Sequence, residues 1–538
     1  MRIPAPGIAL LALLISAGCQ RRAEPDAAPD SPVLRISQRN EPDELDPALA
    51  SLPDDFFIIR ALSEGLVSPA MHGGDPVPAA AEHWEVSADG RVWRFHLRPG
   101  AQWSNGEPVA AADFVASYRR ALAPATAGPR ADLFFAVANA QAYASGRLSD
   151  FSQVGFRAAA PDELVVTLER PVARFLDYAA TGPWIPVNAG TVAEFGREWT
   201  QPGRYVGNGP FVLAEWRPNQ RIVVRKNPRY HGAAQVRLGE IQFLRFDDEN
   251  AEEHAYRANE VDVTMALPTS KLELYARERP AELHQAPLAE TRYLAFNTRR
   301  PPLNDVRVRR ALALAIDRRR LALDVVRGGR RPADRLVPPE MRPAGEPALP
   351  SGFAGGLSGP AAYDKARQLL AAAGFPAGSH FPRLELAGWS NNPVLDAIQE
   401  MWKKNLGIEV AIVNRDARAH LAVARAGGYD IAFLPLIPQV PDPLPLLGGF
   451  ATGAPDNYPQ WSDPRFDALV AAALTAAPGR AGPLLRAAEE RLLDQCPATP
   501  LYYNAQNWAM RTAVHGWQQD GFWNRSYLGL SLDAATPP

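Results

Sequence analysis

The chain has 538 residues, of which 46% are apolar and 22% charged, and its 57 basic and 59 acidic side chains leave a formal net charge of -2. These proportions are those of a globular protein with a sizeable core, and the balanced charge argues against a nucleic-acid-binding protein, which would carry a basic excess. The two cysteines are too few for a disulfide framework or a cysteine-rich zinc site.

The first 19 residues have the features of an export signal. Arg2 supplies a positive charge, and Ile8 to Ile15 form an apolar run too short to span a bilayer. Small residues then precede Cys19, so residues 1–19 resemble a bacterial lipoprotein signal in which lipidated Cys19 becomes the mature N-terminus. An ordinary secretory signal, with Cys19 incidental, is the alternative. Residues 20–32 are polar and rich in Pro and Ala, which predicts a flexible tether.

Alternating apolar and polar residues predict strands in the first half of the mature chain. Residues 33–36 begin the fold, and the alternation recurs over residues 93–98, 164–168 and 221–225. Turn signals on both sides of residues 93–98 indicate a sheet built of hairpins. A helix interrupts these strands, with Asp113 as its expected N-cap.

Helices dominate the second half of the chain. Asn304 or Asp305 is expected to cap one helix. The spacing of apolar residues predicts a second helix over residues 364–373 and a third over residues 396–406, each followed by a glycine that ends it. A strand is expected at residues 408–410, and this alternation of helix and strand indicates a βα-type lobe.

The sequence lacks the motifs that mark common catalytic and metal sites. It has no G-x-S-x-G, H-E-x-x-H, Walker or G-x-G-x-x-G motif, and its nine histidines show no i, i+4 pairing. The acidic run at residues 247–249 fails as an EF-hand loop because Glu252 stands where that loop needs glycine, so we expect a solvated helix start. We predict no catalytic residue, no metal site and no cofactor, and expect Cys496 to be a buried free thiol.

A series of short motifs runs in fixed order through most of the mature chain. The motifs are NEP at 40–42, LDP at 45–47, EGL at 64–66, WRFHLRPG at 93–100, WSNGEPV at 103–109, GNGPF at 207–211, NPRY at 227–230 and PLNDVRVRRAL at 302–312. In this order and spacing they resemble the signature of the family 5 solute-binding proteins, the oligopeptide and dipeptide receptors of ABC importers.

The resemblance implies a mixed α+β and α/β fold of the periplasmic binding protein type II kind, with two lobes around a hinge. It also implies three domains. Domain I would be discontinuous, over residues 33–64, 186–284 and 505–538, with domain II inserted at residues 65–185 and domain III at residues 285–504. The change from strand-rich to helix-rich sequence near residue 290 agrees with the last boundary.

The resemblance further implies a periplasmic, lipid-anchored and monomeric substrate-binding component of an ABC transporter. Such a protein captures a peptide or a peptide-like small molecule by hinge closure and delivers it to the permease subunits. A receptor of the same fold that senses its ligand without feeding transport is one alternative. An exported hydrolase is another, which the lack of any nucleophile motif disfavours.

Several candidate cleft residues follow from the resemblance. Leu52, Pro53 and Asp54 match the loop that runs beside the ligand, and Asn297 follows the strand entering domain III. Trp389 could stack on a ligand. Each has a structural alternative: an inert surface loop for residues 52–54, a turn-capping role for Asn297 and core packing for Trp389.

The sequence departs from the family at the expected amine-binding position. Peptide receptors of the family usually carry an aspartate, three residues before an acidic-Pro pair, that binds the ligand's α-ammonium. The pair here is Asp442-Pro443, and the earlier position holds Gln439, whereas Phe433 and Ala417 replace an expected arginine and tryptophan. A neutral amide cannot offset the charge of a buried ammonium group, which costs roughly a few kcal/mol of binding free energy. We therefore expect either that Asp442 takes this role or that the ligand has no free amine there.

Overall fold

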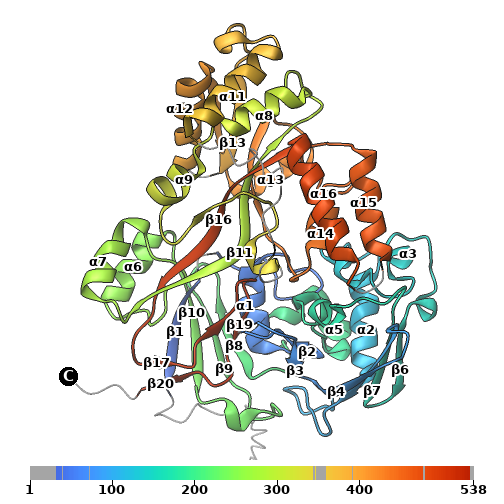
Figure 1. The fold of residues 1–538 in the computed structure, drawn as a ribbon. Helices are drawn as coiled ribbons and strands as arrows, with labels where there is room; N and C mark the ends of the chain where they lie inside the picture. The colour runs from blue at the N-terminus through green and yellow to red at the C-terminus, as the bar shows by residue number, and fades with distance from the viewer. Residues whose placement is uncertain are drawn as a thin grey trace, which may run out of the picture.

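The computed structural model describes residues 32–38, 40–71, 73–342, 346, 359–389, 392–476 and 479–533. The predicted signal at residues 1–19, Cys19 and the predicted tether, apart from its last residue, lie outside these residues. The described chain forms a mixed α/β protein with an upper and a lower lobe (Figure 1). Within the described ranges, none of the helices is long and apolar enough to cross a membrane.

One sheet of the lower lobe is built around the first strand. Its order is β1 (Val33–Gln38), β10 (Glu240–Arg245), β9 (Arg221–Lys226) and β8 (Phe211–Arg217). Strand β1 pairs in parallel with β10, and the other pairs are antiparallel. Helix α1 (Pro53–Leu62) packs its apolar residues into the core that this sheet covers.

A second four-stranded sheet of the lower lobe is entirely antiparallel. Its order is β4 (Ala81–Val86), β5 (Val92–Leu97), β7 (Glu163–Thr167) and β6 (Phe156–Ala160). Helix α2 (Ala111–Leu122) covers it, and the Tyr118, Phe134 and Trp184 rings pack together beneath the helix. Close aromatic packing of this kind stabilises the lobe. The short hairpin of β2 (Val67–Ser68) and β3 (Val77–Pro78) lies beside it.

The upper lobe has one mixed six-stranded sheet. Its order is β12 (Arg331–Pro332), β16 (Ala498–Ala509), β11 (Leu283–Phe296), β15 (Ile431–Leu436), β13 (Leu384–Trp389) and β14 (Val410–Arg415). Leu294 and Phe296 pack against α8 (Val306–Leu314), α11 (Gly359–Ala372) and α12 (Pro393–Leu406).

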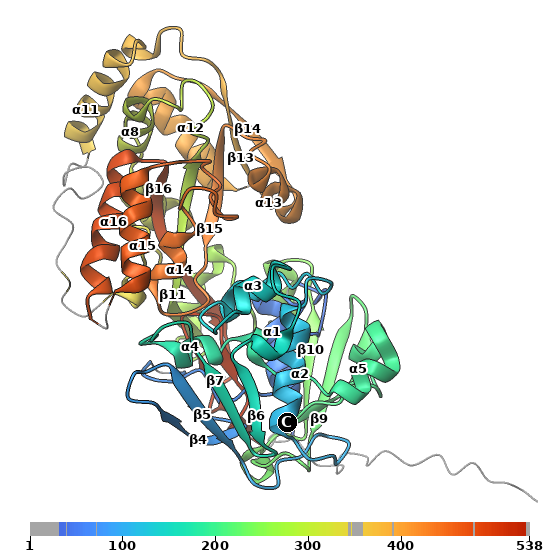
Figure 2. The same cartoon turned by 90° about the vertical axis from the view of Figure 1, so that its right-hand side faces the viewer.

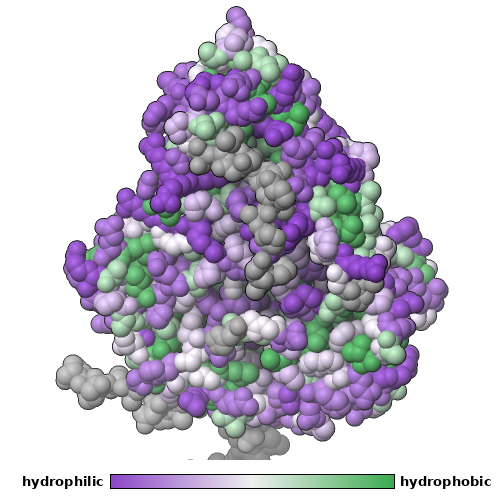
Figure 3. All heavy atoms as spheres, viewed as in Figure 1, coloured by the Kyte–Doolittle hydropathy of each residue, from purple (hydrophilic) through white to green (hydrophobic). Residues whose placement is uncertain are grey.

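Helices also cover the opposite face of the six-stranded sheet. Tyr293 and Ala295, which alternate with the residues above, pack among the helices α13 (Ala417–Arg425), α14 (Pro443–Gly448), α15 (Pro464–Thr475) and α16 (Ala481–Gln495). The sheet is therefore buried on both faces, which agrees with the continuous apolar run of its central strand β15. On the face of the molecule shown in Figure 3, apolar side chains appear in small groups separated by polar ones.

The two longest strands connect the lobes. Strands β11 and β16 pair with each other and run from the lower into the upper lobe (Figures 1 and 2). Their register shifts between Pro287 and Thr291. Such an irregularity interrupts the ladder and bends the strand, so this stretch is a natural bending point between the lobes.

Most of the predicted elements are confirmed. Strands occupy the four predicted positions, as β1, β5, β7 and β9. Asp305 caps α8 by accepting the Arg307 N–H at 2.8 Å. The acidic run starts a helix, α6 (Glu249–Arg257), which Asp248 caps. Cys496 is a buried free thiol.

Some predicted boundaries are wrong. Asp113 does not cap α2, which begins at Ala111; its carboxylate instead accepts the Ala110 N–H at 2.8 Å from within the first turn. The helix predicted from residue 364 begins at Gly359. The helix predicted from residue 396 begins at Pro393, because Asn392 supplies the cap. The strand expected at residues 408–410 begins only at Val410.

Candidate ligand-binding site

A cavity of about 990 Å³ lies where the two lobes meet. The lower lobe supplies α1, the β2–β3 hairpin and residues 519–524, and the upper lobe supplies α14, α16, Arg335, Val337, residues 340–342 and Glu346. This volume is of the size that encloses a small organic ligand. Much of the wall is apolar and includes Phe56, Met71, Val337, Met341, Leu447 and Trp523.

Helix α1 places two lining side chains one turn apart. The Asp55 carboxylate accepts the N–H groups of Ser51 and Leu52 at 3.2 and 3.1 Å, which fixes the start of the helix. Burial raises the pKa of Asp55 to about 6, although these hydrogen bonds oppose the rise. Residues four apart share one helix face, and Phe56 and Arg60 both reach the cavity wall.

The Phe56 ring is accommodated by a glycine of the lower lobe. A Cβ atom at Gly182 would lie 2.0 Å from Phe56 Cε1. No side chain larger than hydrogen therefore fits at residue 182 while Phe56 keeps its position.

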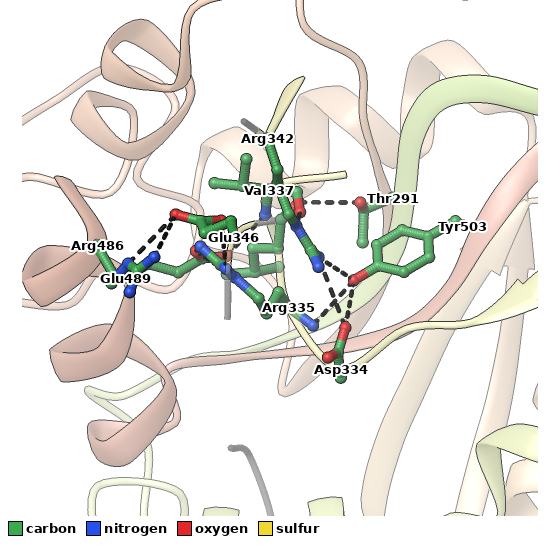
Figure 4. A network of polar contacts seen from close by, with 10 residues as sticks. Thr291, Asp334, Arg335, Val337, Arg342, Glu346, Arg486, Glu489 and Tyr503 are labelled. Carbon is green, nitrogen blue, oxygen red and sulfur yellow. Dashed lines mark hydrogen bonds and ion pairs between the residues drawn. The ribbon is translucent and has the colours of Figure 1, made fainter. Parts of the chain in front are cut away.

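A network of buried charges forms the wall on the upper lobe (Figure 4). Arg335 Nε donates to Glu489 at 2.8 Å, and Arg335 Nη1 donates to Glu346 at 2.8 Å. Arg486 binds the other oxygen of Glu346 at 3.0 Å. The side chains of Arg335 and Glu489 are 5% and 1% exposed. Because each charge has an opposite partner, the network holds this wall in one arrangement.

A direct contact joins the lobes beside the cavity. Tyr178, in α4 (Phe175–Ala179) of the lower lobe, donates from its hydroxyl to Asp442 Oδ2 at 3.1 Å. Asp442 Oδ1 accepts the Leu444 N–H at 2.9 Å and so caps α14. Leu133 and Val440 pack with Tyr178 across the same interface.

Three of the predicted site residues line the cavity: Pro53, Gln439 and Asp442. Leu52 and Asp54 are adjacent to the cavity rather than in its wall. Leu52 occupies the N-cap position of α1, and Asp54 is buried with its main-chain oxygen accepting from Gln38 at 3.0 Å.

Asn297 and Trp389 do not line the cavity. The Asn297 amide donates to the main-chain oxygens of Gly427 and Tyr429, both at 3.0 Å, which is the turn-capping alternative. Trp389 packs on Phe433 with ring centroids 5.0 Å apart, as a core aromatic residue would.

Other lining residues were not identified from the sequence, among them Phe56, Arg60, Arg335, Glu489 and Trp523. The spacing of Phe56 and Arg60 on a helix that starts at Pro53 was an available signal. No local signal could have revealed the Arg335–Glu489 pair, whose members are 154 positions apart.

Residues 75–458 match the family model described as bacterial extracellular solute-binding proteins, family 5, middle part. A probable deoxycholate-binding periplasmic protein of Escherichia coli is 35% identical over 483 residues, covering 88% of each chain. The periplasmic oligopeptide-binding protein of Escherichia coli is 32% identical over 470 residues, covering 86% of each.

The murein tripeptide binding protein of Escherichia coli has a similar solved structure, with a TM-score of 0.85 and 31% identity over 94% of this chain and 99% of that one. The unliganded open form of that protein superposes less well, with a TM-score of 0.73. The lobes of the present chain are thus arranged less like that open form.

Proposed function

The chain belongs to family 5 of the bacterial extracellular solute-binding proteins, and on that premise we propose that it captures a peptide or peptide-like solute in the periplasm for an ABC permease. Its role is binding and delivery rather than catalysis. The observation that carries this proposal is the cavity between the lobes, whose wall comes from both of them.

Closure of the lobes is the step that would bury the solute. Strands β11 and β16 supply the bend, and contacts between the lobes hold the closed form: the Tyr178–Asp442 hydrogen bond and an ion pair between Arg418 and Asp43. Removing the solute from water requires a partner for each of its polar groups, which the two walls together would supply.

The proposed moving parts are the three domains inferred from the resemblance. Domain I at residues 33–64, 186–284 and 505–538 would carry domain II at 65–185, and domain III at 285–504 would close against them. The sheets support this division, because the two lower sheets fall within domains I and II and the upper sheet lies mostly within domain III.

The solute would lack a free amine at the position usual for the family. Gln439 lines the cavity but is neutral, and Asp442 already accepts hydrogen bonds from Tyr178 and from the start of α14. A second candidate follows from the apolar wall and from the deoxycholate-binding relative: an amphipathic acid that is not a peptide.

We further propose how the protein is held at the membrane and in which oligomeric state. A lipid on Cys19 would hold the protein at the membrane as a monomer beside its permease. Replacing Cys19 by Ala should move the protein from the membrane to the soluble fraction of the periplasm. Unchanged fractionation would instead favour an ordinary secretory signal.

The test of the function is native mass spectrometry of protein purified from its host. We expect a retained solute that is released intact on unfolding, and host cells without the chain should lose uptake of that solute. Uptake that persists would favour the sensing role, and a solute recovered only as cleavage products would contradict the proposal.

A further inference from the structure

Arg60 differs from the other arginines of the cavity wall. Four of them, Arg174, Arg335, Arg342 and Arg486, each form an ion pair with a described carboxylate. Arg60 forms no ion pair with any residue of the described ranges. Its one hydrogen bond there runs from Nη2 to the main-chain oxygen of Ala180, at 2.9 Å.

The remaining donors of Arg60 have no acceptor within the described residues. A guanidinium carries five N–H donors, and Nε is buried without an acceptor in the described structure. Burial lowers the pKa of Arg60 to about 10, so the side chain stays positive at neutral pH. An unpaired, desolvated cation in the wall of a binding cavity is costly until an anion arrives.

The carboxylate that acts on the charge of Arg60 does not neutralise it directly. Asp520 lines the same cavity and favours the charged form of Arg60, but the two make no ion pair within 4.0 Å. Its oxygens accept the N–H groups of Phe522 and Asn524 and the Asn524 amide, all at 2.8 Å. Asp520 therefore offsets part of the charge and leaves the donors of Arg60 free.

Unlike Arg60, nearly all the acidic side chains of the cavity wall have partners. Asp177, Glu340, Glu346 and Glu489 are paired with arginines, and Asp442 and Asp520 accept hydrogen bonds from protein donors. Asp75, which is exposed beside the β2–β3 hairpin, is the exception among the described lining residues. The wall thus has an unpaired, half-buried cation, whereas its half-buried and buried acids all have partners.

We propose that Arg60 binds an anionic group of the solute, and that the solute is an amphipathic carboxylate without a free ammonium group. Its apolar part would lie against Phe56, Met341 and Trp523, which line the same cavity. This inference rests on the proposed function. Two kinds of solute have this carboxylate chemistry: a peptide with a blocked N-terminus and an acid that is not a peptide.

Isothermal titration calorimetry tests the inference with matched acids and amides. The probes are N-acetyl-Leu-Leu and its C-terminal amide, deoxycholate and its amide, and Leu-Leu-Leu with a free amine. For the wild type we expect at least one acid to bind about 10- to 100-fold more tightly than its amide, because a charge-assisted hydrogen bond is lost. Which acid binds identifies the source.

Variants then assign the effect to Arg60. Arg60→Gln should weaken binding of the acid by the same factor and leave binding of the amide unchanged. The affinity of Arg60→Lys for the acid should lie between those of the wild type and Arg60→Gln. Arg465→Gln, which removes an exposed charge outside the cavity, is the matched control and should change neither. The thermal unfolding of each unliganded variant checks folding, and the acid–amide comparison on wild type needs no variant.

The outcomes distinguish the role of Arg60 from the proposed capture of a solute. Equal binding of acid and amide, or an acid that binds Arg60→Gln as well as wild type, would overturn the role of Arg60 while leaving solute capture intact. Tighter binding of Leu-Leu-Leu than of N-acetyl-Leu-Leu would overturn the lack of an ammonium group. No binding of any probe would count against both.

Discussion

The Tyr178 hydroxyl in the lower lobe donates to Asp442 Oδ2 in the upper lobe at 3.1 Å. Burial and the nearby carboxylate raise the pKa of Tyr178, so the hydroxyl stays protonated and remains a donor. The same carboxylate caps α14, which ties the lobe contact to a helix that lines the cavity. Tyr178 itself is not among the residues that line the cavity, so we expect its hydrogen bond to affect closure of the lobes rather than contact with the solute.

Tyr178→Phe should shift the unliganded protein toward an open form. A hydrogen bond of this kind contributes about 0.5–1.5 kcal/mol, and a smaller closed population weakens apparent affinity by the same ratio for every solute. We expect about 2- to 10-fold weaker binding by calorimetry. Tyr143→Phe removes a hydroxyl for which the described structure shows no hydrogen bond, and should change nothing. A loss that differs between solutes would indicate direct contact instead.

Gly182→Ala should disturb the cavity through Phe56. The new Cβ would meet the ring at 2.0 Å, so the ring or the backbone must move. Overpacking of this kind costs about 1–3 kcal/mol, which a lowered melting temperature would report. At Gly482, an added Cβ meets nothing within 4 Å, so Gly482→Ala should be neutral or slightly stabilising. Equal melting temperatures for the two variants would show that Phe56 is not confined.

Glu489→Gln should strongly destabilise the upper lobe. The change leaves Arg335, whose side chain is 5% exposed, without its closest counter-charge. Breaking one member of a buried pair costs about 3–5 kcal/mol in denaturant unfolding. Glu278→Gln, in an exposed pair with Arg277, should cost under about 1 kcal/mol. Similar losses for the two variants would mean that the buried network is dispensable.

The pH dependence of stability should carry a contribution from Asp55. Its pKa is about 6 in the folded protein against an ordinary 3.8, so the folded state binds the proton more tightly between these values. Stability from this group is therefore full below about pH 4 and falls by up to about 3 kcal/mol as the pH rises from about 4 to about 6. Asp55→Asn should flatten that part of the profile in denaturant titrations. Parallel profiles for wild type and variant would contradict the assignment.

The two-lobed fold could be predicted from the order of the family motifs along the chain, and many of its helices and strands from local sequence patterns. Motifs such as PLNDVRVRRAL at residues 302–312 place a capped helix next to a strand, and Asp305 caps that helix as expected. Boundaries failed where several polar residues compete. The helix predicted from residue 396 starts earlier because Asn392 caps it. Asp113 lies within the first turn of its helix, where its carboxylate reaches back to the preceding N–H.

The site was only partly predictable. The family resemblance placed Gln439 and Asp442, which lie three residues apart in one loop, and both line the cavity. Trp389 could not be placed, because its contacts with Phe433 come from a neighbouring strand of the folded sheet. The missing ion pair of Arg60 is likewise a property of the assembled wall, since no sequence pattern states which of the lining arginines meets an acid.

Small-angle X-ray scattering of solute-free protein, titrated with the solute recovered from the host, tests the central proposition most directly. The account predicts that the radius of gyration falls as the solute saturates the cavity, and that Tyr178→Phe begins from a larger value and needs more solute to reach the same end point. A radius that stays constant while calorimetry shows full binding would contradict it.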